Sequence, residues 1–447
     1  MHVEHLSRLL NEALRTGAAP GAAIAVSIDG RRLEHAAGAA NWSSGSAMST
    51  QSRFQMGCIT KLLTSLVTLE LENSSRLDLD QPIGCWLPEV RSTSAGQTIT
   101  PRHLLSHTSG YQGLNIADPA VRYYYGWPKF LALLGAGRQL FPAGRVFNYE
   151  HTECVLLGEI AQRLTGRSLR ELFGAMIFDP LGIHCGDLRS DMSNPRCGVM
   201  DHACNGEPGQ FTPLRAVPYC SFWDASLSDL TMSLADLVTL GEAVAGFRHG
   251  VFSTRTIETI RRAYVELPSS FGGKHHERMP IAFGCGCAQY DDSVFGHNGS
   301  ARGQTCALRF DVSTRAVLAV GLNCWQPHAR DLLCTKVITA LRGGRTASAA
   351  RPDPAQWSFA ELTGRYVGAL GSCIEVSATD SGLSCAIIGT PPQPTTRVLV
   401  LRAGSGELQV SSEVPHLTMG FFRPPASSTP GLMVGLNAYC REQALPA

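Results

Sequence analysis

The chain has 447 residues, with 38 Lys and Arg against 37 Asp and Glu, a formal net charge of +1 at pH 7 and 44% hydrophobic residues. This near-neutral balance, without a large basic cluster, argues against binding to nucleic acid or to an anionic membrane surface. No stretch approaches the roughly 20 apolar residues of a membrane span. The length exceeds one ordinary hydrophobic core, so we expect two or three domains.

The N-terminal segment 3–16 has the spacing of an amphipathic helix and carries acidic residues where a signal sequence would be apolar. We therefore expect no secretion signal and a cytoplasmic location. The 15 cysteines agree with this, because their odd number and scattered positions favour reduced thiols over a disulfide framework. We expect neither a metal nor another cofactor, since no His or Cys pair lies at the spacing of metal ligands.

An apolar strand pattern at 20–26 is followed by the turn Asp29-Gly30 and a return strand that ends near Gly38. Next, Cys58-Ile59-Thr60-Lys61 opens a segment whose broad apolar surface predicts a buried helix. Positions three apart share a helix face, so the Lys61 amine can lie beside the Cys58 sulfur and favour the nucleophilic thiolate. Alone this spacing is weak, because a buried structural Cys and a Lys that reaches solvent would also give it.

Six further segments follow Cys58 along the chain. They are 77–82, the run Ile99-Thr100-Pro101-Arg102-His103-Leu104-Leu105-Ser106-His107-Thr108-Ser109-Gly110, Phe141-Pro142-Ala143-Gly144, Asn148-Tyr149-Glu150-His151 with the helical continuation 156–160, the segment 177–183, and Phe295-Gly296-His297-Asn298-Gly299-Ser300. In this order they resemble the penicillin-binding protein and class C β-lactamase superfamily of serine hydrolases. The resemblance covers most of residues 18–325.

This resemblance implies an α/β (α+β) fold, in which an antiparallel sheet is flanked by helices and an all-helical subdomain lies between the first and third catalytic motifs. Strand patterns at 22–28, 305–310 and 316–322 would build the sheet. Helices near 3–16, 59–72, 153–165 and 328–342 would cover it. The active site would then lie at the seam between the sheet and the helical lobe.

Acyl transfer requires a nucleophile, a base, an acid for the leaving group and donors for the oxyanion. By resemblance, Cys58 is the nucleophile and stands where the family keeps a serine. Lys61 would help to deprotonate it, and Tyr149 would relay the proton to the leaving group. The backbone amides of Cys58 and Ser300 would form the oxyanion hole, and Gly299 belongs to the same motif.

Three residues depart from the family pattern. A thiol at position 58 needs less base assistance than a hydroxyl, and amines attack thioesters readily, which tilts the interpretation from hydrolysis toward transacylation. His151 stands where the tyrosine motif usually carries an asparagine that binds the substrate's acyl side-chain amide, so amide-type recognition is in doubt. His297, on the far wall of the cleft, replaces a lysine that binds a drug carboxylate. A true β-lactamase is therefore not expected.

Residues 344–356 are small, polar and proline-bearing, which is typical of a linker. The linker would separate a catalytic domain at 1–343 from a C-terminal domain at 357–447. Short alternating segments divided by turns predict an antiparallel β-barrel or sandwich in this last domain. It resembles the lipocalin-like domain of some superfamily members, where a buttress and a substrate-gating or partner-docking role stay equally open.

The sequence thus predicts an acyl-enzyme-forming acyltransferase or hydrolase that acts on a small ester, thioester or amide through Cys58, in biosynthesis. The expected partners are a small-molecule acyl donor and an amine or alcohol acceptor, with a carrier protein as a further candidate. Two alternatives remain: a D-amino-acid peptidase or esterase-type hydrolase, and a catalytically silent binding or regulatory homologue. A third concerns Cys58 itself, which would then be an engineered substitution for serine.

Overall fold

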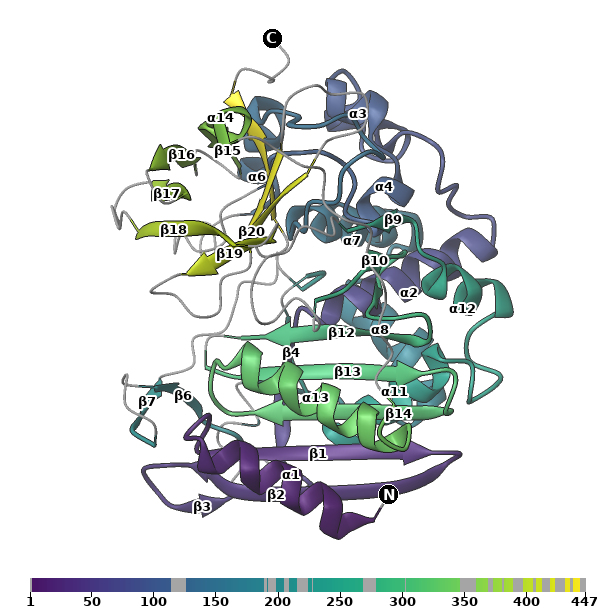
Figure 1. The fold of residues 1–447 in the computed structure, drawn as a ribbon. Helices are drawn as coiled ribbons and strands as arrows, with labels where there is room; N and C mark the ends of the chain where they lie inside the picture. Colours follow the sequence, from purple (N-terminus) through teal and green to yellow (C-terminus); the bar gives the residue numbers. More distant parts are fainter. Residues whose placement is uncertain are drawn as a thin grey trace. The chain divides into compact units, whose positions relative to one another are not determined.

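The computed structural model describes residues 2–113, 126–188, 191, 198–204, 209–214, 224–226, 228–267, 279–301, 303–345, 359–368, 373–379, 382–388, 397–404, 407–411, 419–422, 431–434 and 437–442. The chain divides into two compact units. The first consists of Met1–Leu77, Leu157–Arg262 and Gly284–Ser348, and the second of Asp78–Leu156, Ala263–Phe283 and Ala349–Ala447. Each unit contains one large antiparallel sheet (Figure 1).

The sheet of the first unit joins strands from residues 21–47 with strands from residues 288–322. Its strands lie in the order β3 (Ser46–Ala47), β2 (Arg31–Asn41), β1 (Gly21–Ile28), β14 (Ala316–Leu322), β13 (Thr305–Asp311), β12 (Val294–Ser300) and β11 (Ala288–Gln289), and all neighbours are antiparallel. The predicted hairpin and the two predicted late strands are thus confirmed. Strands β1, β13 and β14 are central, and every residue of β13 and β14 and all but the last residue of β1 is buried, as a strand covered on both sides requires.

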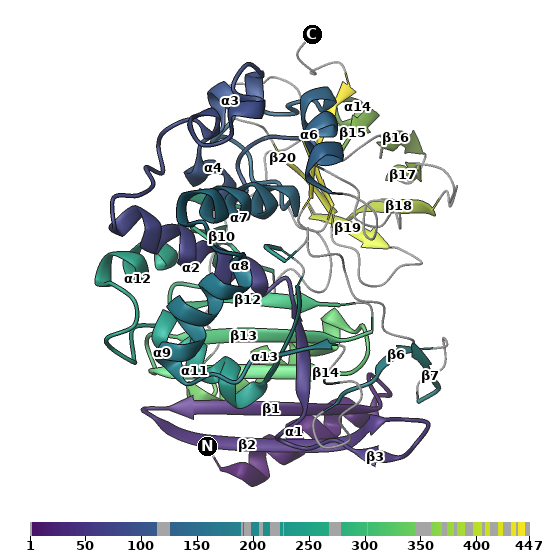
Figure 2. The ribbon, with the colours of Figure 1, turned by 180° about the vertical axis from the view of Figure 1, so that it is seen from behind.

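Helices cover both faces of this sheet. On one face α1 (Val3–Arg15) and α13 (Pro327–Leu341) pack on a core that includes Ile24, Val26 and Val320. On the other face α11 (Leu234–Val244) brings Gly241 against Val317 and Leu308, where a Cβ would come within 2.5 Å of Val317 (Figure 2). Residues that face α1 and α13 alternate along the strands with residues that face α11, because successive side chains of a strand point to opposite faces.

A smaller sheet leads to the helix that follows Cys58. It contains β4 (Arg53–Gly57), β8 (Ser228–Ser233) and β5 (Gly186–Asp187), and β4 continues into α2 (Thr60–Asn73). The first unit also holds α8 (Leu169–Phe173), η3 (Gly174–Phe178), α9 (Asp179–Leu181), α12 (Thr254–Arg261) and the hairpin β6 (Asp201–Cys204) with β7 (Phe211–Leu214). The predicted helices α1, α2 and α13 are confirmed to within two residues at each end.

The second unit combines helices and a C-terminal sheet. The helical elements are η1 (Ile83–Cys85), η2 (Pro88–Val90), α3 (Ser94–Thr98), α4 (Pro101–Leu105), α6 (Trp127–Ala136), the start of the predicted α7 (Thr152–Thr165), and α14 (Phe359–Leu362). A short pair, β9 (Val265–Glu266) and β10 (Ala282–Phe283), is also present. Among the described residues from Thr60 to Leu181, the named elements are helical, but from Gly186 short strands occur before the third motif, so the all-helical part is smaller than predicted.

The predicted antiparallel C-terminal sheet is confirmed, with eight strands among the described residues. They lie in the order β19 (Glu407–Ser411), β18 (Arg397–Gly404), β17 (Gly382–Ile388), β16 (Cys373–Thr379), β15 (Gly364–Val367), β22 (Asn437–Arg441), β21 (Gly431–Val434) and β20 (Met419–Phe422). Most of the predicted linker 344–356 lies outside the described residues. Likewise Cys197 and Cys220 lie outside them, and no disulfide joins the cysteines within the described part of the chain.

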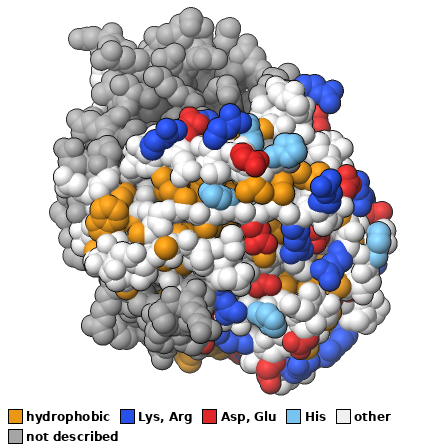
Figure 3. Space-filling view, turned by 90° about the horizontal axis from the view of Figure 1, so that it is seen from below, with side chains coloured by type: hydrophobic (Ala, Val, Ile, Leu, Met, Phe, Trp, Pro, Cys, Tyr) orange, Lys and Arg blue, Asp and Glu red, His pale blue; other side chains and the backbone are white. Residues whose placement is uncertain are grey.

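The distribution of charged side chains on the described surface agrees with the net charge of +1. Figure 3 shows positive and negative side chains interspersed on the face seen from below. Surface ion pairs such as Arg315 with Asp29 (3.1 Å) and Lys336 with Glu12 (2.8 Å) have the same mixed character. Among the described helices, none combines the length and the apolar character needed to cross a membrane.

Candidate active site

Cys58 lies in the turn that joins β4 to α2. The amide of Ile59 donates to the Met56 carbonyl at 3.0 Å, and the amide of Lys61 donates to the Cys58 carbonyl at 3.0 Å. The turn therefore runs directly into the helix, whose first residue is Thr60. The hydrogen bonds of the turn fix the backbone at Cys58. Because the residue is only half-buried, it remains accessible to a substrate.

Lys61 is in the first turn of α2 and is only 1% exposed. Its Nζ atom donates to the backbone carbonyl of Ser226 at 3.3 Å, and Ser226 is itself buried. A buried ammonium is costly unless hydrogen bonds compensate for the lost water. This lysine is therefore not the solvent-reaching side chain that the alternative interpretation of the spacing required.

The backbone of β12 runs directly beside the residues that precede Cys58. A Cβ atom on Gly57 would lie 2.5 Å from the Ser300 carbonyl oxygen and 3.0 Å from the Ser300 nitrogen. A Cβ atom on Gly299 would lie 2.2 Å from the Met56 carbonyl oxygen. Gly57 also has a φ of +47°. The two glycines thus allow an approach that side chains would prevent, and they bring the backbones at Cys58 and Ser300 close together.

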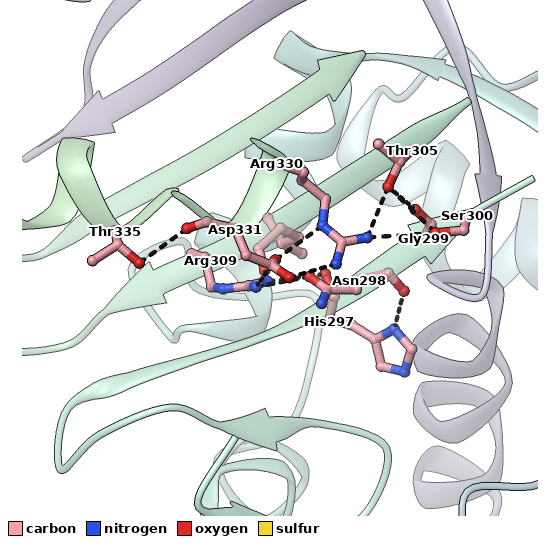
Figure 4. A network of polar contacts seen from close by, with 10 residues as sticks. His297, Asn298, Gly299, Ser300, Thr305, Arg309, Arg330, Asp331 and Thr335 are labelled. Carbon is pink, nitrogen blue, oxygen red and sulfur yellow. Dashed lines mark hydrogen bonds and ion pairs between the residues drawn. The ribbon is translucent and has the colours of Figure 1, made fainter. Parts of the chain in front are cut away.

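His297 lies near the middle of β12 and is 3% exposed. Its Nδ1 atom lies 2.7 Å from the carbonyl oxygen of Asn298. A carbonyl oxygen can only accept, so Nδ1 carries a proton; when the ring is neutral, Nε2 is then the acceptor. In Figure 4 the His297 ring points away from the guanidinium groups of Arg309 and Arg330.

Two buried arginines hold β12 from the α13 side (Figure 4). Arg309 donates to the side-chain oxygen of Asn298 at 2.7 Å, and Arg330 donates to Thr305 Oγ1 at 2.8 Å. Both guanidinium groups pair with Asp331, at 3.2 Å and 2.8 Å. Sequence patterns missed this network, because charged residues at a helix start and in a strand are ordinarily assigned to solvent.

Tyr149 lies in the second unit among other rings. Its ring centroid is 4.5 Å from that of His107, 5.8 Å from that of His151 and 6.5 Å from that of Phe283. His151 is half-buried, and its amide donates to Glu150 Oε2 at 3.2 Å. The predicted sites therefore fall in two groups: Cys58, Lys61, His297, Gly299 and Ser300 belong to the first unit, whereas Tyr149 and His151 belong to the second.

Other cysteines near β12 are poor nucleophiles. Burial raises the pKa of the Cys287 thiol to about 12 and that of the Cys306 thiol to about 12. Cys306 donates to the carbonyl of Gln55 at 3.3 Å, so it packs under β4 as a small buried side chain. Cys58 is therefore the better placed of these thiols for reaction with a substrate.

The fold and the ordered motifs are those of a known hydrolase family. The Beta-lactamase family matches residues 6–341, so the chain belongs to this family, as the resemblance in its sequence predicted. The chain is 29% identical over 330 residues to penicillin-binding protein 4 of Amycolatopsis lactamdurans, which covers 70% of this chain and 83% of the relative.

Two other relatives carry hydrolase names. The chain is 30% identical over 220 residues to esterase EstB of Burkholderia gladioli, covering 45% of this chain and 55% of EstB, so it spans about half of that relative. It is 26% identical over 372 residues to a D-aminopeptidase of Cereibacter sphaeroides, covering 80% of this chain and 67% of the relative.

Solved structures share the fold over nearly the whole chain. SurE superposes with a TM-score of 0.74 at 23% identity, covering 98% of this chain and 99% of SurE. The octameric penicillin-binding protein homologue from Pyrococcus abyssi superposes with a TM-score of 0.65 at 19% identity, covering 98% of this chain and 100% of that protein. The C-terminal sheet is thus part of the shared architecture.

Proposed function

We propose that this protein is an acyltransferase or hydrolase that forms a thioester on Cys58. The observation that carries the proposal is the close approach of β12 to the end of β4, beside the half-buried thiol. Thioester formation needs a nucleophile next to two amide donors that stabilise the developing oxyanion. The amides of Cys58 and Ser300 supply these donors in the proposal, with Gly299 keeping the two strands close.

In the first half-reaction, Cys58 Sγ attacks the carbonyl carbon of the acyl donor. Cys58 and Lys61 react as a thiolate–ammonium pair, and the ammonium proton passes through Tyr149 to the leaving group as the carbon–sulfur bond forms and the leaving-group bond breaks. In the second half-reaction an acceptor attacks the thioester, its proton passes through Tyr149 back to Lys61, and the carbon–sulfur bond breaks to release Cys58 as a thiolate. An amine acceptor gives transacylation, and water gives hydrolysis.

The two histidines would bind the substrate. His297 presents an acceptor nitrogen, because its Nδ1 proton is engaged with the Asn298 carbonyl. It would therefore take a hydrogen bond from an N–H or O–H group of the donor or the acceptor. His151, two residues after Tyr149 along the chain, would contact the acyl side chain.

The relatives favour an acyl donor that contains a D-amino acid. A D-aminopeptidase aligns with 80% of this chain, a larger share than penicillin-binding protein 4 at 70% or EstB at 45%. A small ester, thioester or amide of a D-amino acid agrees with these names. Delivery by a carrier protein, a biosynthetic role and a cytoplasmic location are part of the proposal and rest on the sequence patterns alone.

Intact-protein mass spectrometry would test the proposal with N-acetylcysteamine thioesters of D-alanine and L-alanine. We expect an acyl adduct on the native chain, formed faster from the D-thioester, absent in Cys58→Ala, and lost faster with an added amine than in water. An active Cys58→Ser variant beside an inert native chain would overturn the thiol as nucleophile. Absence of turnover in both would favour the silent homologue.

A further inference from the structure

The backbone on either side of Tyr149 lies against His107, and one of the two contacts is a backbone hydrogen bond. The amide of Asn148 donates to the His107 carbonyl at 2.8 Å. The amide nitrogen of Glu150 lies 3.4 Å from His107 Nδ1. Between these two contacts, the Tyr149 ring lies with its centroid 4.5 Å from that of the imidazole, at an interplanar angle of 44°. One histidine therefore touches the tyrosine ring and the backbone on either side of it.

We propose that His107 is a positioning residue for Tyr149. The inference rests on the proposed function, in which the Tyr149 hydroxyl relays a proton. A phenol can relay a proton only if its hydroxyl keeps its direction, and a ring contact with backbone anchors restricts both side-chain torsions of the tyrosine. His107 acts through Tyr149 and needs no contact with the substrate.

The surroundings of His107 hold it firmly. It is 1% exposed, and its Nδ1 is hydrogen-bonded to Glu153 Oε2, with both side chains 2% exposed. The other Glu153 oxygen accepts from the Ser109 amide at 3.3 Å. The rings of Phe283 and Phe147 meet the imidazole edge-on at 5.1 Å and 6.0 Å. All these residues belong to the second unit.

The backbone of His107 is in an uncommon conformation. Its φ is +54°, in the left-handed region that costs a non-glycine residue of order 1 kcal/mol or more. Such a conformation persists where the neighbours over-determine it, and it is concentrated at functional sites. Here it points the carbonyl of His107 to the Asn148 amide while the ring packs against Tyr149.

A double-mutant cycle tests the proposal with p-nitrophenyl butyrate as the probe. We expect His107→Ala to lower kcat about 10- to 100-fold with KM changed less than about threefold, because a positioning loss acts on the chemical step. In a Tyr149→Phe background, the same substitution should cost less than about threefold, because the group that His107 positions is already gone. His107→Asn should recover part of kcat, since Asn tolerates positive φ and places an amide donor where Nδ1 was.

The matched control is His103→Ala. His103 is a half-buried histidine of α4, and its Nδ1 accepts from the Thr100 amide at 3.2 Å. We expect its replacement to lower the melting temperature and to change kcat less than about threefold. If His107→Ala does not fold, Glu153→Gln, which keeps the size of the side chain, replaces it in the cycle.

The outcomes separate the inference from the proposed function. Suppose that Tyr149→Phe is impaired and that His107→Ala lowers kcat by the same factor in the native chain and in Tyr149→Phe. This result would overturn the positioning role of His107 and leave the proposed function standing. Full activity of Tyr149→Phe would overturn the relay role of Tyr149 and the inference with it. Non-additive losses together with recovery in His107→Asn would support both.

Discussion

Replacing Gly299 by alanine tests whether the approach of β12 to β4 sets the rate of acylation. The added Cβ would lie 2.2 Å from the Met56 carbonyl oxygen and 2.6 Å from Cys306 Sγ. Carbon and oxygen atoms in contact are usually about 3.3 Å apart or more, so the strands must separate by about 1 Å. A displacement of about 1 Å between catalytic groups costs roughly 100-fold in rate, whereas overpacking costs about 1–3 kcal/mol of stability.

We therefore expect a folded Gly299→Ala variant whose thioester forms about 100-fold more slowly, measured as the time course of the acyl adduct on Cys58 by mass spectrometry. Gly174→Ala is the matched control, since nothing lies within 4 Å of a Cβ added there. Its acylation rate should stay within about twofold of the native rate, because a surface substitution away from the site is nearly neutral. Acylation of Gly299→Ala at the native rate, with an unchanged melting temperature, would refute the reasoning.

Three other substitutions test further contacts. Burial alone would raise the pKa of Asp311, but hydrogen bonds from Arg342 and neighbouring serines lower it from 3.8 to about 2, so Asp311→Asn should cost about 2 kcal/mol at pH 7. Because the lowered pKa stabilises the fold only above about pH 4, the difference should shrink from there toward pH 2 in acid-unfolding curves. Lys61→Met should lower the acylation rate at least about 100-fold and leave the melting temperature unchanged or higher, since it removes a buried charge; native acylation would contradict its role. Gln112→Ala removes the bond from its Nε2 to the Gly368 carbonyl at 3.1 Å and should speed hydrogen exchange in β15, while unchanged exchange would mean that this contact does not anchor the C-terminal sheet.

The apolar pattern of the sequence and the order of its motifs predicted most of the strands and helices of the first unit. The strands at Gly21–Ile28 and Ala316–Leu322 were predictable because each is an apolar run between turns, broken only by Ser27, as buried strands require. Cys58 and Lys61 could be proposed because helical spacing is local. The same reasoning could not find the contact between Gly57 and Ser300. A glycine allows another part of the backbone to come close, but a single sequence does not identify that part.

Residues that support the site indirectly were harder to find. His107 lies within the family segment at 99–110, yet only the folded chain brings its ring to Tyr149 and its Nδ1 to Glu153. Arg309 and Arg330 are charged residues that hydropathy assigns to solvent, whereas they are 3% and 4% exposed beneath β12. Such contacts depend on tertiary structure, and they carry no periodic signal.

The buried charges also bear on whether the protein is an enzyme. Lys61 lies in the first turn after Cys58, and the guanidinium groups of Arg309 and Arg330 share the carboxylate of Asp331 behind the strand that ends at Ser300. Replacing buried charges by apolar groups of similar volume is often neutral or stabilising, so stability alone gives little reason to keep them. A positive field beside a thiol and two amides does favour a thiolate and an oxyanion. The free-energy cost of burying these charges is therefore understandable in a chain that forms an acyl-enzyme. In a silent homologue the same cost would have no evident purpose.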